Sequence, residues 1–273
     1  MSQPSLSTIS LNLEQGIAEI RLDRPDKSNA MNDAMWQEIR QAFEWADATP
    51  EVRVVILSGA GRNFCAGIDL ALLGGIQQRI AHPDGARSRE ALRRLILDLQ
   101  DCLTSVERCR KPVLAAIQGA CIGGALDLVT CCDMRYAAAD AVFSVREIDV
   151  GMVADVGTLQ RLPRLIPEGI ARELAFTGRN FVADEGERLG LINRVFPSHE
   201  ALTAAVREIA QTIAAKSPLA MRGIKEVMNF SRGHSIADGL NFVATWNASM
   251  LLSDDLNEVI IAQREKRAPR FAD

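Results

Sequence analysis

The chain is poor in aromatic residues and histidine, and it lacks the apolar run of a membrane span. Phe, Trp and Tyr make up 5% of the 273 residues, and there are three histidines. No uninterrupted apolar stretch approaches the roughly 20 residues that a transmembrane helix needs. The net charge of −4 provides no general attraction to nucleic acid or to an anionic membrane. We therefore expect a globular protein with no nucleic-acid and no membrane partner.

Several signatures of catalysis and targeting are also missing. The sequence has no GxSxG, HExxH, GxGxxG or P-loop motif, and none of its six cysteines forms a CxxC or has ligand spacing with a histidine. We therefore expect no metal and no cofactor, and we interpret the cysteines as reduced packing residues. The chain starts without a secretory or transit signal and ends without a peroxisomal address. By default, the expected location is the cytoplasm.

Alternating strand and helix patterns predict an α/β fold. Strand patterns cover residues 7–13, 16–22, 52–57, 112–117, 134–137 and 141–145. Helical patterns cover 32–46 and 88–108, the latter with Ser88 as its expected N-cap. After Asp155 the pattern is almost entirely helical, apart from a short strand near 191–195. We therefore divide the chain into an α/β core, residues 1–198, and a helical C-terminal region, residues 199–273.

Three carboxylic acids occupy largely apolar surroundings. Asp127 follows a glycine pair within an apolar run, and Glu147 and Asp155 lie eight residues apart in a second apolar stretch. Carboxylates are rarely buried unless they are paired or hydrogen-bonded, because removing a charge from water is costly. Acid–base enzymes use such groups, since contrasting environments separate their pKa values. The three acids are therefore candidate catalytic residues.

Each acid also has a purely structural interpretation. Asp127 is the hardest to explain in this way, because its apolar neighbours include no obvious cation; its structural alternative is a buried aspartate that accepts hydrogen bonds from neighbouring N–H groups. Glu147 follows Arg146, with which it can form an ordinary ion pair. Asp155 can cap a helix that begins near Val156. Taken together, these interpretations account less well for three acids so close in the sequence.

Two glycine-bearing turns each follow a strand and open a helix. The first spans residues 63–69 (NFCAGID) and the second residues 119–125 (GACIGGA). Such turns point free N–H groups outward, which suits a developing negative charge. Alone, the first turn is better explained as a simple strand-to-helix connection. Asp69 is explained equally well by the helix macrodipole, which favours an acid in the first turn. Together the two turns can converge on one oxygen as an oxyanion hole.

In order and spacing, these motifs resemble the crotonase, or enoyl-CoA hydratase/isomerase, superfamily over nearly the whole chain. The residues that carry the likeness are Arg24-Pro25, Asn29 to Asn32, Cys65 to Asp69, Lys111-Pro112 and Gly119 to Asp133. Within the superfamily, the acids at 127, 147 and 155 and the segments 154–162, 217–218 and 246–250 resemble the dienoyl-CoA isomerase branch.

The resemblance implies a fold and a substrate. The fold is a crotonase-like spiral of stacked ββα units with a helical C-terminal oligomerisation region, assembled as a homotrimer or a homohexamer. The substrate is an acyl-CoA, so that coenzyme A enters as part of the substrate and not as a cofactor. Its thioester oxygen accepts hydrogen bonds from the N–H groups of Ile68 and Gly124. By the same analogy Ala66, Gly67, Ile68, Asp69 and Leu70 line the CoA site, and Lys27 and Lys266 are weaker candidates for phosphate contact.

The resemblance also implies a reaction. Typical hydratases carry glutamates at the positions of Asp127 and Glu147 and a glycine at the position of Asp155. The acid at 155 therefore favours isomerisation of a 3,5-dienoyl-CoA to a 2,4-dienoyl-CoA over water addition. Asp155 is expected to remove the C2 proton and Glu147 to return one at the far end, while Asp127 tunes the pocket. Ala125 departs from the family's usual third glycine and narrows the pocket.

Two alternatives remain at this point. The same site suits an enoyl-CoA hydratase or a 3,2-enoyl-CoA isomerase. A relative without catalytic activity, which binds RNA or serves as a scaffold, is the alternative from another class. The acidic net charge and the three acids count against it.

Overall fold

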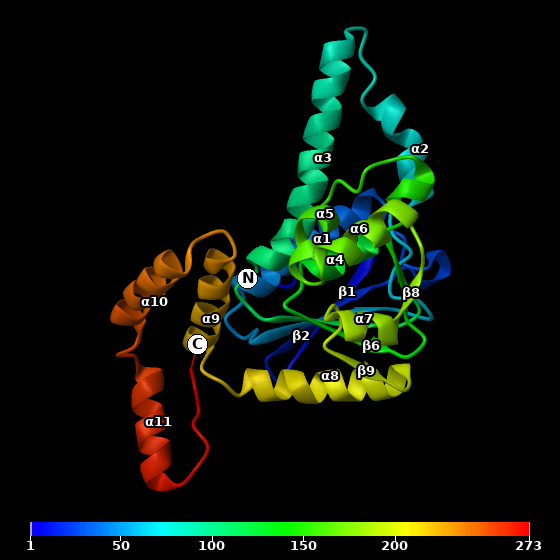
Figure 1. The fold of residues 1–273 in the computed structure, drawn as a ribbon. Coiled ribbons are helices and arrows are strands. Elements are labelled where there is room, and N and C mark those ends of the chain that lie inside the picture. The colour runs from blue at the N-terminus through cyan, green and yellow to red at the C-terminus, as the bar shows by residue number, and fades with distance from the viewer. Residues whose placement is uncertain (1, 273) are drawn as a thin grey trace.

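A computed structural model describes residues 2–272, in which helices and strands alternate until a run of C-terminal helices (Figure 1). The strands are β1 (Ile9–Glu14), β2 (Ile17–Leu22), β3 (Val54–Gly59), β4 (Val113–Ile117), β5 (Ala120–Ile122), β6 (Met134–Ala138), β7 (Val142–Ser144), β8 (Phe181–Val182) and β9 (Arg194–Phe196). The α-helices are α1 (Asp33–Ala48), α2 (Leu70–Arg79), α3 (Gly85–Arg108), α4 (Gly124–Thr130), α5 (Thr158–Arg161), α6 (Glu168–Thr177), α7 (Ala183–Leu189), α8 (His199–Ala214), α9 (Pro218–Ser231), α10 (Ile236–Met250) and α11 (Asp254–Glu265). Short 3-10 helices cover Pro25–Lys27 (η1), Glu147–Val150 (η2) and Leu162–Arg164 (η3).

Two sheets form the core. The larger has the order β1-β2-β3-β4-β6-β9, in which β1 and β2 form an antiparallel hairpin and the remaining pairs are parallel. The smaller has the order β5-β7-β8. All six residues of β3 and all five of β4 are buried, as expected for parallel strands covered on both faces.

The chain passes repeatedly from the larger sheet to the smaller one and then into a helix. β4 of the larger sheet leads to β5 of the smaller sheet and then to α4, and β6 leads to β7 and η2 in the same way. A bridge between Cys65 and Cys121 adds a further turn at the level of β3. This repetition confirms the expected α/β spiral of stacked ββα units.

Most predicted elements are present, but the start of α3 was predicted wrongly. The helix begins at Gly85, where the Asp84 side chain accepts a hydrogen bond from the Ala86 N–H. Ser88, the expected N-cap, lies inside the helix, and its hydroxyl oxygen accepts from the His82 N–H instead. The earlier start adds a turn of α3 to the arm that it forms with α2 (Figure 1).

The cysteines are all buried and unpaired, which confirms their interpretation as reduced packing residues. Burial raises the pKa of the Cys65 thiol to about 12, so this thiol carries no charge at neutral pH. None of the helices within residues 2–272 has both the length and the apolar character that a membrane crossing requires.

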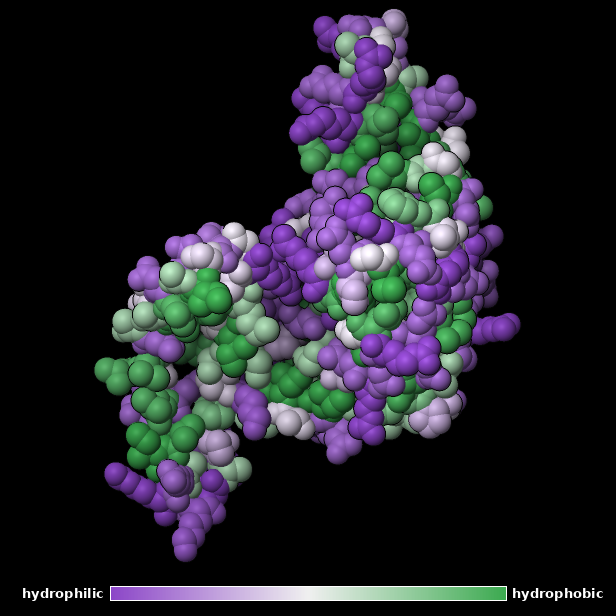
Figure 2. Space-filling view, in the orientation of Figure 1, coloured by the Kyte–Doolittle hydropathy of each residue, from purple (hydrophilic) through white to green (hydrophobic). Residues whose placement is uncertain are grey.

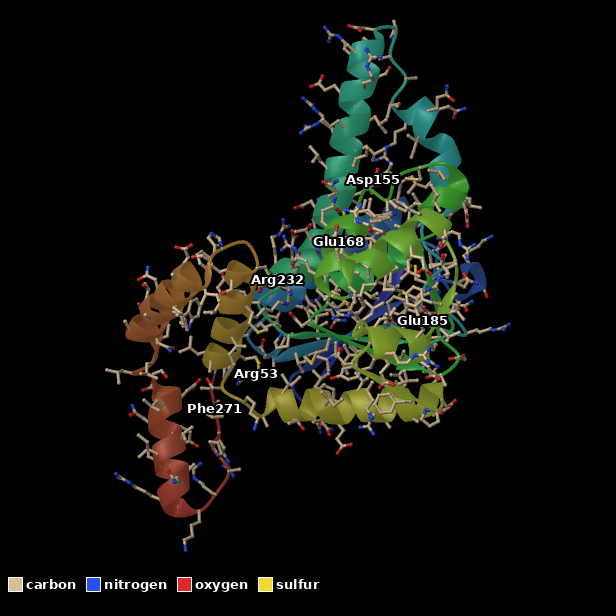
Figure 3. All side chains as sticks on the ribbon, in the orientation of Figure 1. Arg53, Asp155, Glu168, Glu185, Arg232 and Phe271 are labelled. Atoms are coloured by element: carbon tan, nitrogen blue, oxygen red, sulfur yellow. The ribbon has the colours of Figure 1, made fainter. Side chains whose placement is uncertain are left out.

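The C-terminal helices differ in how they contact the core. α8 packs on the larger sheet through Leu202, Val206 and Ala210, so it covers one face of the core although it follows the predicted boundary at residue 198. Helices α9 to α11 extend away from the core (Figure 1). The buried Lys225 of α9 holds this extension by donating to Asp133 Oδ2 at 2.8 Å. At the chain end, Arg53 Nη2 donates to the Phe271 carbonyl oxygen at 2.9 Å (Figure 3).

Candidate active site

The Ile68 N–H group is free to bind a ligand. Met31 donates to the Gly67 carbonyl and accepts from the Asp69 N–H, so this short parallel bridge uses the peptide groups on either side of Ile68. The Ile68 N–H therefore points away from Met31, and it has no acceptor among residues 2–272. The Gly124 N–H, the first of α4, likewise has no acceptor in the described part of the chain.

The two turns that carry these N–H groups lie against each other. Gly67 has a φ of +93°, and a Cβ there would lie 2.5 Å from the Ile122 carbonyl oxygen and 3.5 Å from the Gly124 nitrogen. A Cβ on Gly124 would lie 3.8 Å from the Ile68 nitrogen. Only glycine allows this close approach at position 67. The predicted partners Ile68 and Gly124 are therefore adjacent in space, as an oxyanion hole requires.

A cavity of about 330 Å³ opens beside this N–H pair. Its walls include Ala66, Gly67, Ile68 and Gly124, which were predicted to bind substrate. Its outer part is aliphatic and runs between α2 and α3, where it is lined by Leu70, Leu73, Ile76, Leu92, Leu95, Ile96 and Leu99. Green side chains are visible between these helices in Figure 2. The cavity thus joins a polar end at the glycine turns to an apolar groove.

Three residues predicted to contact coenzyme A lie outside the cavity lining. Asp69 caps α2, where its side chain accepts from the Ala71 N–H, and it pairs with Arg24 at 3.1 Å. This structural role explains an acid at the start of the helix. Lys27 and Lys266 do not line the cavity either, and Lys266 follows α11 in the C-terminal extension.

Glu147 lies directly over the second glycine turn, at Gly123. A Cβ at Gly123 would lie 3.1 Å from Glu147 Oε1, while Glu147 Oε2 is buried without a hydrogen-bond partner within residues 2–272. Burial, with the charge of Asp127 as a further cause, raises the pKa of Glu147 to about 7. Arg146 pairs with Asp149 at 3.0 Å, so the alternative ion pair to Glu147 does not form.

Asp155 also lines the cavity, in the loop that precedes α5. It lies below the arm formed by α2 and α3 (Figure 3). Burial raises the pKa of its carboxyl group. α5 begins at Thr158 with Gly157 as its N-cap, so Asp155 is not the helix cap that its sequence context allowed.

Asp127 lies behind the cavity wall and does not line it. Its side chain is fully buried, and its Oδ1 accepts a hydrogen bond from the Thr158 N–H at 2.5 Å. Oδ2 has no partner among the described residues. Burial raises the pKa of Asp127 to about 6. The carboxyl groups of Asp127, Glu147 and Asp155 are close enough for their charges to act on one another.

The cavity contains residues that sequence reasoning did not select. Trp36 of α1 lines it and lies beside the second glycine turn, since a Cβ on Gly124 would be 3.8 Å from the Trp36 ring. Its position at the buried face of an amphipathic helix gives no sequence signal beyond ordinary packing. The described residues contain no cluster of His, Cys, Asp and Glu side chains that could hold a metal ion.

The arrangement thus combines two free N–H groups, two acids at one cavity and an aliphatic groove. Comparison with known proteins agrees with this geometry. The enoyl-CoA hydratase/isomerase family model matches residues 12–273. The chain belongs to the enoyl-CoA hydratase/isomerase family.

Within the family, similar curated proteins carry a more particular name. The chain is 48% identical over 272 residues to the peroxisomal Delta(3,5)-Delta(2,4)-dienoyl-CoA isomerase of Arabidopsis thaliana, with 99% of this chain and 98% of the relative covered. It is 44% identical to the mitochondrial Delta(3,5)-Delta(2,4)-dienoyl-CoA isomerase of Homo sapiens, with coverage of 93% and 78%. A solved enoyl-CoA hydratase from Bacillus anthracis superposes with a TM-score of 0.87 at 31% identity, covering 97% of this chain and 99% of that one.

These names contradict the expected cytoplasmic location. The plant relative is named peroxisomal and the human relative mitochondrial. The expectation rested on the absence of recognised signals, and such an absence gives no positive evidence for any compartment.

Proposed function

We propose that this protein is an isomerase that converts a 3,5-dienoyl-CoA into the conjugated 2,4-dienoyl-CoA. The observation that carries the proposal is the position of two acids, Glu147 and Asp155, in the same cavity as the N–H groups of Ile68 and Gly124. Relatives named for this reaction, at 44% and 48% identity, support it.

In this mechanism the thioester carbonyl oxygen accepts hydrogen bonds from the Ile68 and Gly124 N–H groups. These bonds strengthen as negative charge moves onto the oxygen, so they stabilise the enolate more than the bound substrate. The C2 proton thereby becomes acidic enough for a carboxylate to remove. Loss of one such donor typically lowers the rate by roughly 10²–10³.

Two proton transfers then complete the isomerisation. Asp155 takes the proton from C2, and the electron pair of the broken C–H bond spreads over the diene to C6. Glu147 gives its proton to C6, which leaves double bonds at C2 and C4. The raised pKa of Glu147, about 7, keeps a large fraction of this acid protonated near neutral pH. At the end Asp155 holds a proton and Glu147 has lost one, so a proton must return to Glu147 before the next turnover.

Asp127 does not contact the substrate in this scheme. Its charge raises the pKa of Glu147, and its bond to Thr158 fixes the loop that carries Asp155. Metal and redox cofactors have no step to perform, because the reaction moves a proton within one molecule. Coenzyme A is part of the substrate.

The groove between α2 and α3 supports a straight-chain fatty acyl group as the substrate tail. Its seven lining side chains are all Leu or Ile, which contact a flexible hydrocarbon chain without polar partners.

The proposed assembly is a homotrimer or a homohexamer built through the C-terminal helices. These helices and the connection between α10 and α11 expose apolar side chains that are normally covered in a stable protein, among them Ile224, Met228, Ile236, Leu240 and Leu252. Figure 2 shows the apolar surface over α10 and α11.

A direct assay tests the proposed reaction. Purified protein is mixed with a 3,5-dienoyl-CoA, and we expect an absorbance increase from the diene conjugated with the thioester carbonyl. No increase, together with water addition to a 2-enoyl-CoA, would establish a hydratase instead. Folded Asp155→Asn and Glu147→Gln enzymes should lose most activity. If both turned over as fast as the parent, the acid–base roles would be wrong, and binding of RNA without turnover would favour the alternative without catalysis.

A further inference from the structure

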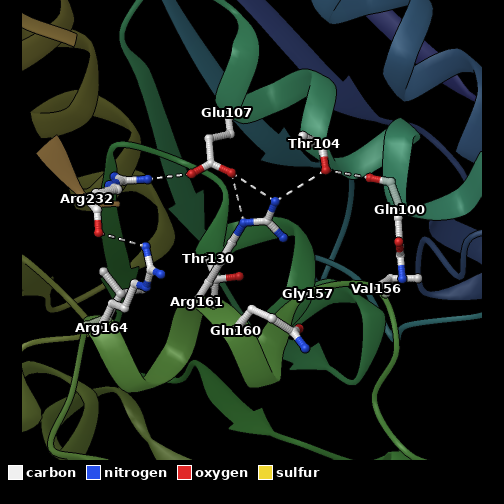
Figure 4. A pocket seen from close by; sticks show the side chains of 11 residues that line it. Gln100, Thr104, Glu107, Thr130, Val156, Gly157, Gln160, Arg161, Arg164 and Arg232 are labelled. Atoms are coloured by element: carbon white, nitrogen blue, oxygen red, sulfur yellow. Dashed lines mark hydrogen bonds and ion pairs between the residues drawn. The ribbon is translucent and has the colours of Figure 1, made fainter. Parts of the chain in front are cut away.

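A second, larger cavity lies behind the loop that carries Asp155. Its volume is about 610 Å³, and its walls come from α3, α5, η3 and the end of α9. Figure 4 shows its polar side chains, which include Gln100, Thr104 and Glu107 of α3. Val156 lines both this cavity and the candidate active site. The Asp155 loop is therefore a thin wall with the substrate cavity on one side and α3 side chains on the other.

Three contacts fix this wall. Gln100 Nε2 donates to the Asp155 carbonyl oxygen at 2.6 Å. The Gly157 carbonyl oxygen accepts a hydrogen bond from the Arg161 N–H at 3.0 Å, and the Arg161 guanidinium lies beside Gly157, where a Cβ would collide with it. At the far end Thr158 is held by Asp127.

The Arg161 side chain is itself held by α3. Its Nε and Nη2 donate to Glu107 Oε2 at 3.0 and 2.9 Å, and its Nη2 donates to Thr104 Oγ1 at 3.3 Å. Thus α3 supports the loop directly through Gln100 and indirectly through Arg161. Of these supports, only the Gln100 bond acts on the residue whose carboxyl group lines the substrate cavity.

We propose that Gln100 is a positioning residue for the catalytic base: its hydrogen bond to the Asp155 carbonyl holds the Asp155 carboxylate at C2 of the substrate. This inference rests on the proposed function, in which Asp155 removes the C2 proton. Gln100 itself does not line the substrate cavity, so its loss leaves substrate contacts in place. Loss of the Gln100 bond changes the position of the Asp155 carboxylate relative to C2. A displacement of about 1 Å at a reacting group can cost roughly 10²-fold in rate.

The test compares Gln100→Met with a matched control. Methionine keeps the length and flexibility of the side chain but has no N–H donor. We expect kcat to fall by roughly 10- to 100-fold while KM and Tm stay near the parent values. Gln160→Met removes an amide from the same cavity that makes no side-chain hydrogen bond within residues 2–272, and it should leave kcat unchanged.

An isotope measurement distinguishes a displaced Asp155 carboxylate from a general loss of structure in the variant. If the base is displaced, C2 proton removal limits the rate, so a C2-deuterated substrate should show a full primary isotope effect with Gln100→Met, at least as large as that of the parent. A kcat within twofold of the parent, or a lower kcat without a primary isotope effect, would overturn the inference. The Asp155→Asn variant distinguishes failure of the proposed function from failure of the proposed role of Gln100. If that enzyme stays fully active, the proposed function fails; if it is inactive while Gln100→Met is normal, only the role of Gln100 fails.

Discussion

The Thr158 N–H donates to Asp127 Oδ1 at 2.5 Å, and this bond joins a fully buried aspartate to the loop that carries Asp155. Asp127 is therefore connected to the candidate site through this loop, although it does not line the cavity. Its second oxygen has no partner in the part of the chain that the structure describes, which leaves its charge poorly stabilised.

Two substitutions separate the effect of the Thr158–Asp127 hydrogen bond from that of the negative charge of Asp127. Asp127→Asn keeps an acceptor for the Thr158 N–H, so we expect little change in the free energy of unfolding. Asp127→Ala leaves that N–H buried and unpaired, which costs about 1–3 kcal/mol. Urea unfolding of both proteins measures the difference. Equal loss of stability in the two variants would show that the hydrogen bond is not what anchors the loop.

The pH dependence of activity should reveal Glu147. Its pKa of about 7 is raised above the ordinary value of a glutamate, so the proton that it donates in the proposed mechanism is present below pH 7 and lost above it. We expect kcat/KM to fall as the pH rises through about 7, and to fall at acid pH as Asp155 becomes protonated.

Removing the charge of Asp127 gives this pH prediction a control. The negative charge of Asp127 contributes to the raised pKa of Glu147, so Asp127→Asn should move the alkaline limb of the profile to lower pH. Glu147→Gln should lose roughly 10²–10⁴-fold in rate and show no such limb. An alkaline limb that persists in Glu147→Gln would assign it to another group.

Gly67→Ala should damage the oxyanion hole. Alanine is strained at a φ of +93°, and its Cβ would lie 2.5 Å from the Ile122 carbonyl, so the two turns must separate. We expect kcat/KM to fall by roughly 10²–10³. The matched control is Gly74→Ala in α2, where a Cβ meets nothing within 4 Å. Comparable activity of the two enzymes would place the oxyanion donors elsewhere.

The aliphatic groove predicts how chain length can be altered. Leu95 of α3 lines the groove, whereas Leu97 on the same helix is 43% exposed and lies outside it. Leu95→Trp should lower kcat/KM for long-chain substrates and preserve it for short ones, because the indole fills the space of the distal carbons. Leu97→Trp should leave the ratio unchanged. An equal loss for all chain lengths with Leu95→Trp would mean that the tail takes another path.

Much of this fold can be predicted from local patterns. The hairpin of residues 7–22, the apolar strands of the larger sheet and the capped helices all follow from hydrophobic period and turn residues. The smaller sheet is harder, since β5 has three residues and β8 two, too few to show alternation. These short strands form because β7 pairs with β5 on one side and with β8 on the other, and these strands come from different turns of the spiral.

The site was predictable in its parts but not in its assembly. The glycine turns that carry Ile68 and Gly124 are visible as motifs, yet their contact depends on strands that are distant in the sequence. The roles given to Glu147 and Asp155 came from the family resemblance, and they stay predictions until variants are measured. Nothing in the sequence indicates the positioning role proposed for Gln100, because one polar residue on an amphipathic helix is typical of any partly exposed face.

Neighbouring residues of α3 face two different parts of the candidate site. Leu99 lines the groove proposed for the acyl tail, and Gln100, the next residue, donates to the carbonyl oxygen of Asp155, the proposed base. In the proposed mechanism, an acyl tail that fits poorly and shifts this helix also shifts the base. We therefore expect the enzyme to discriminate between acyl chains in turnover as well as in affinity, so that an ill-fitting substrate binds without reacting.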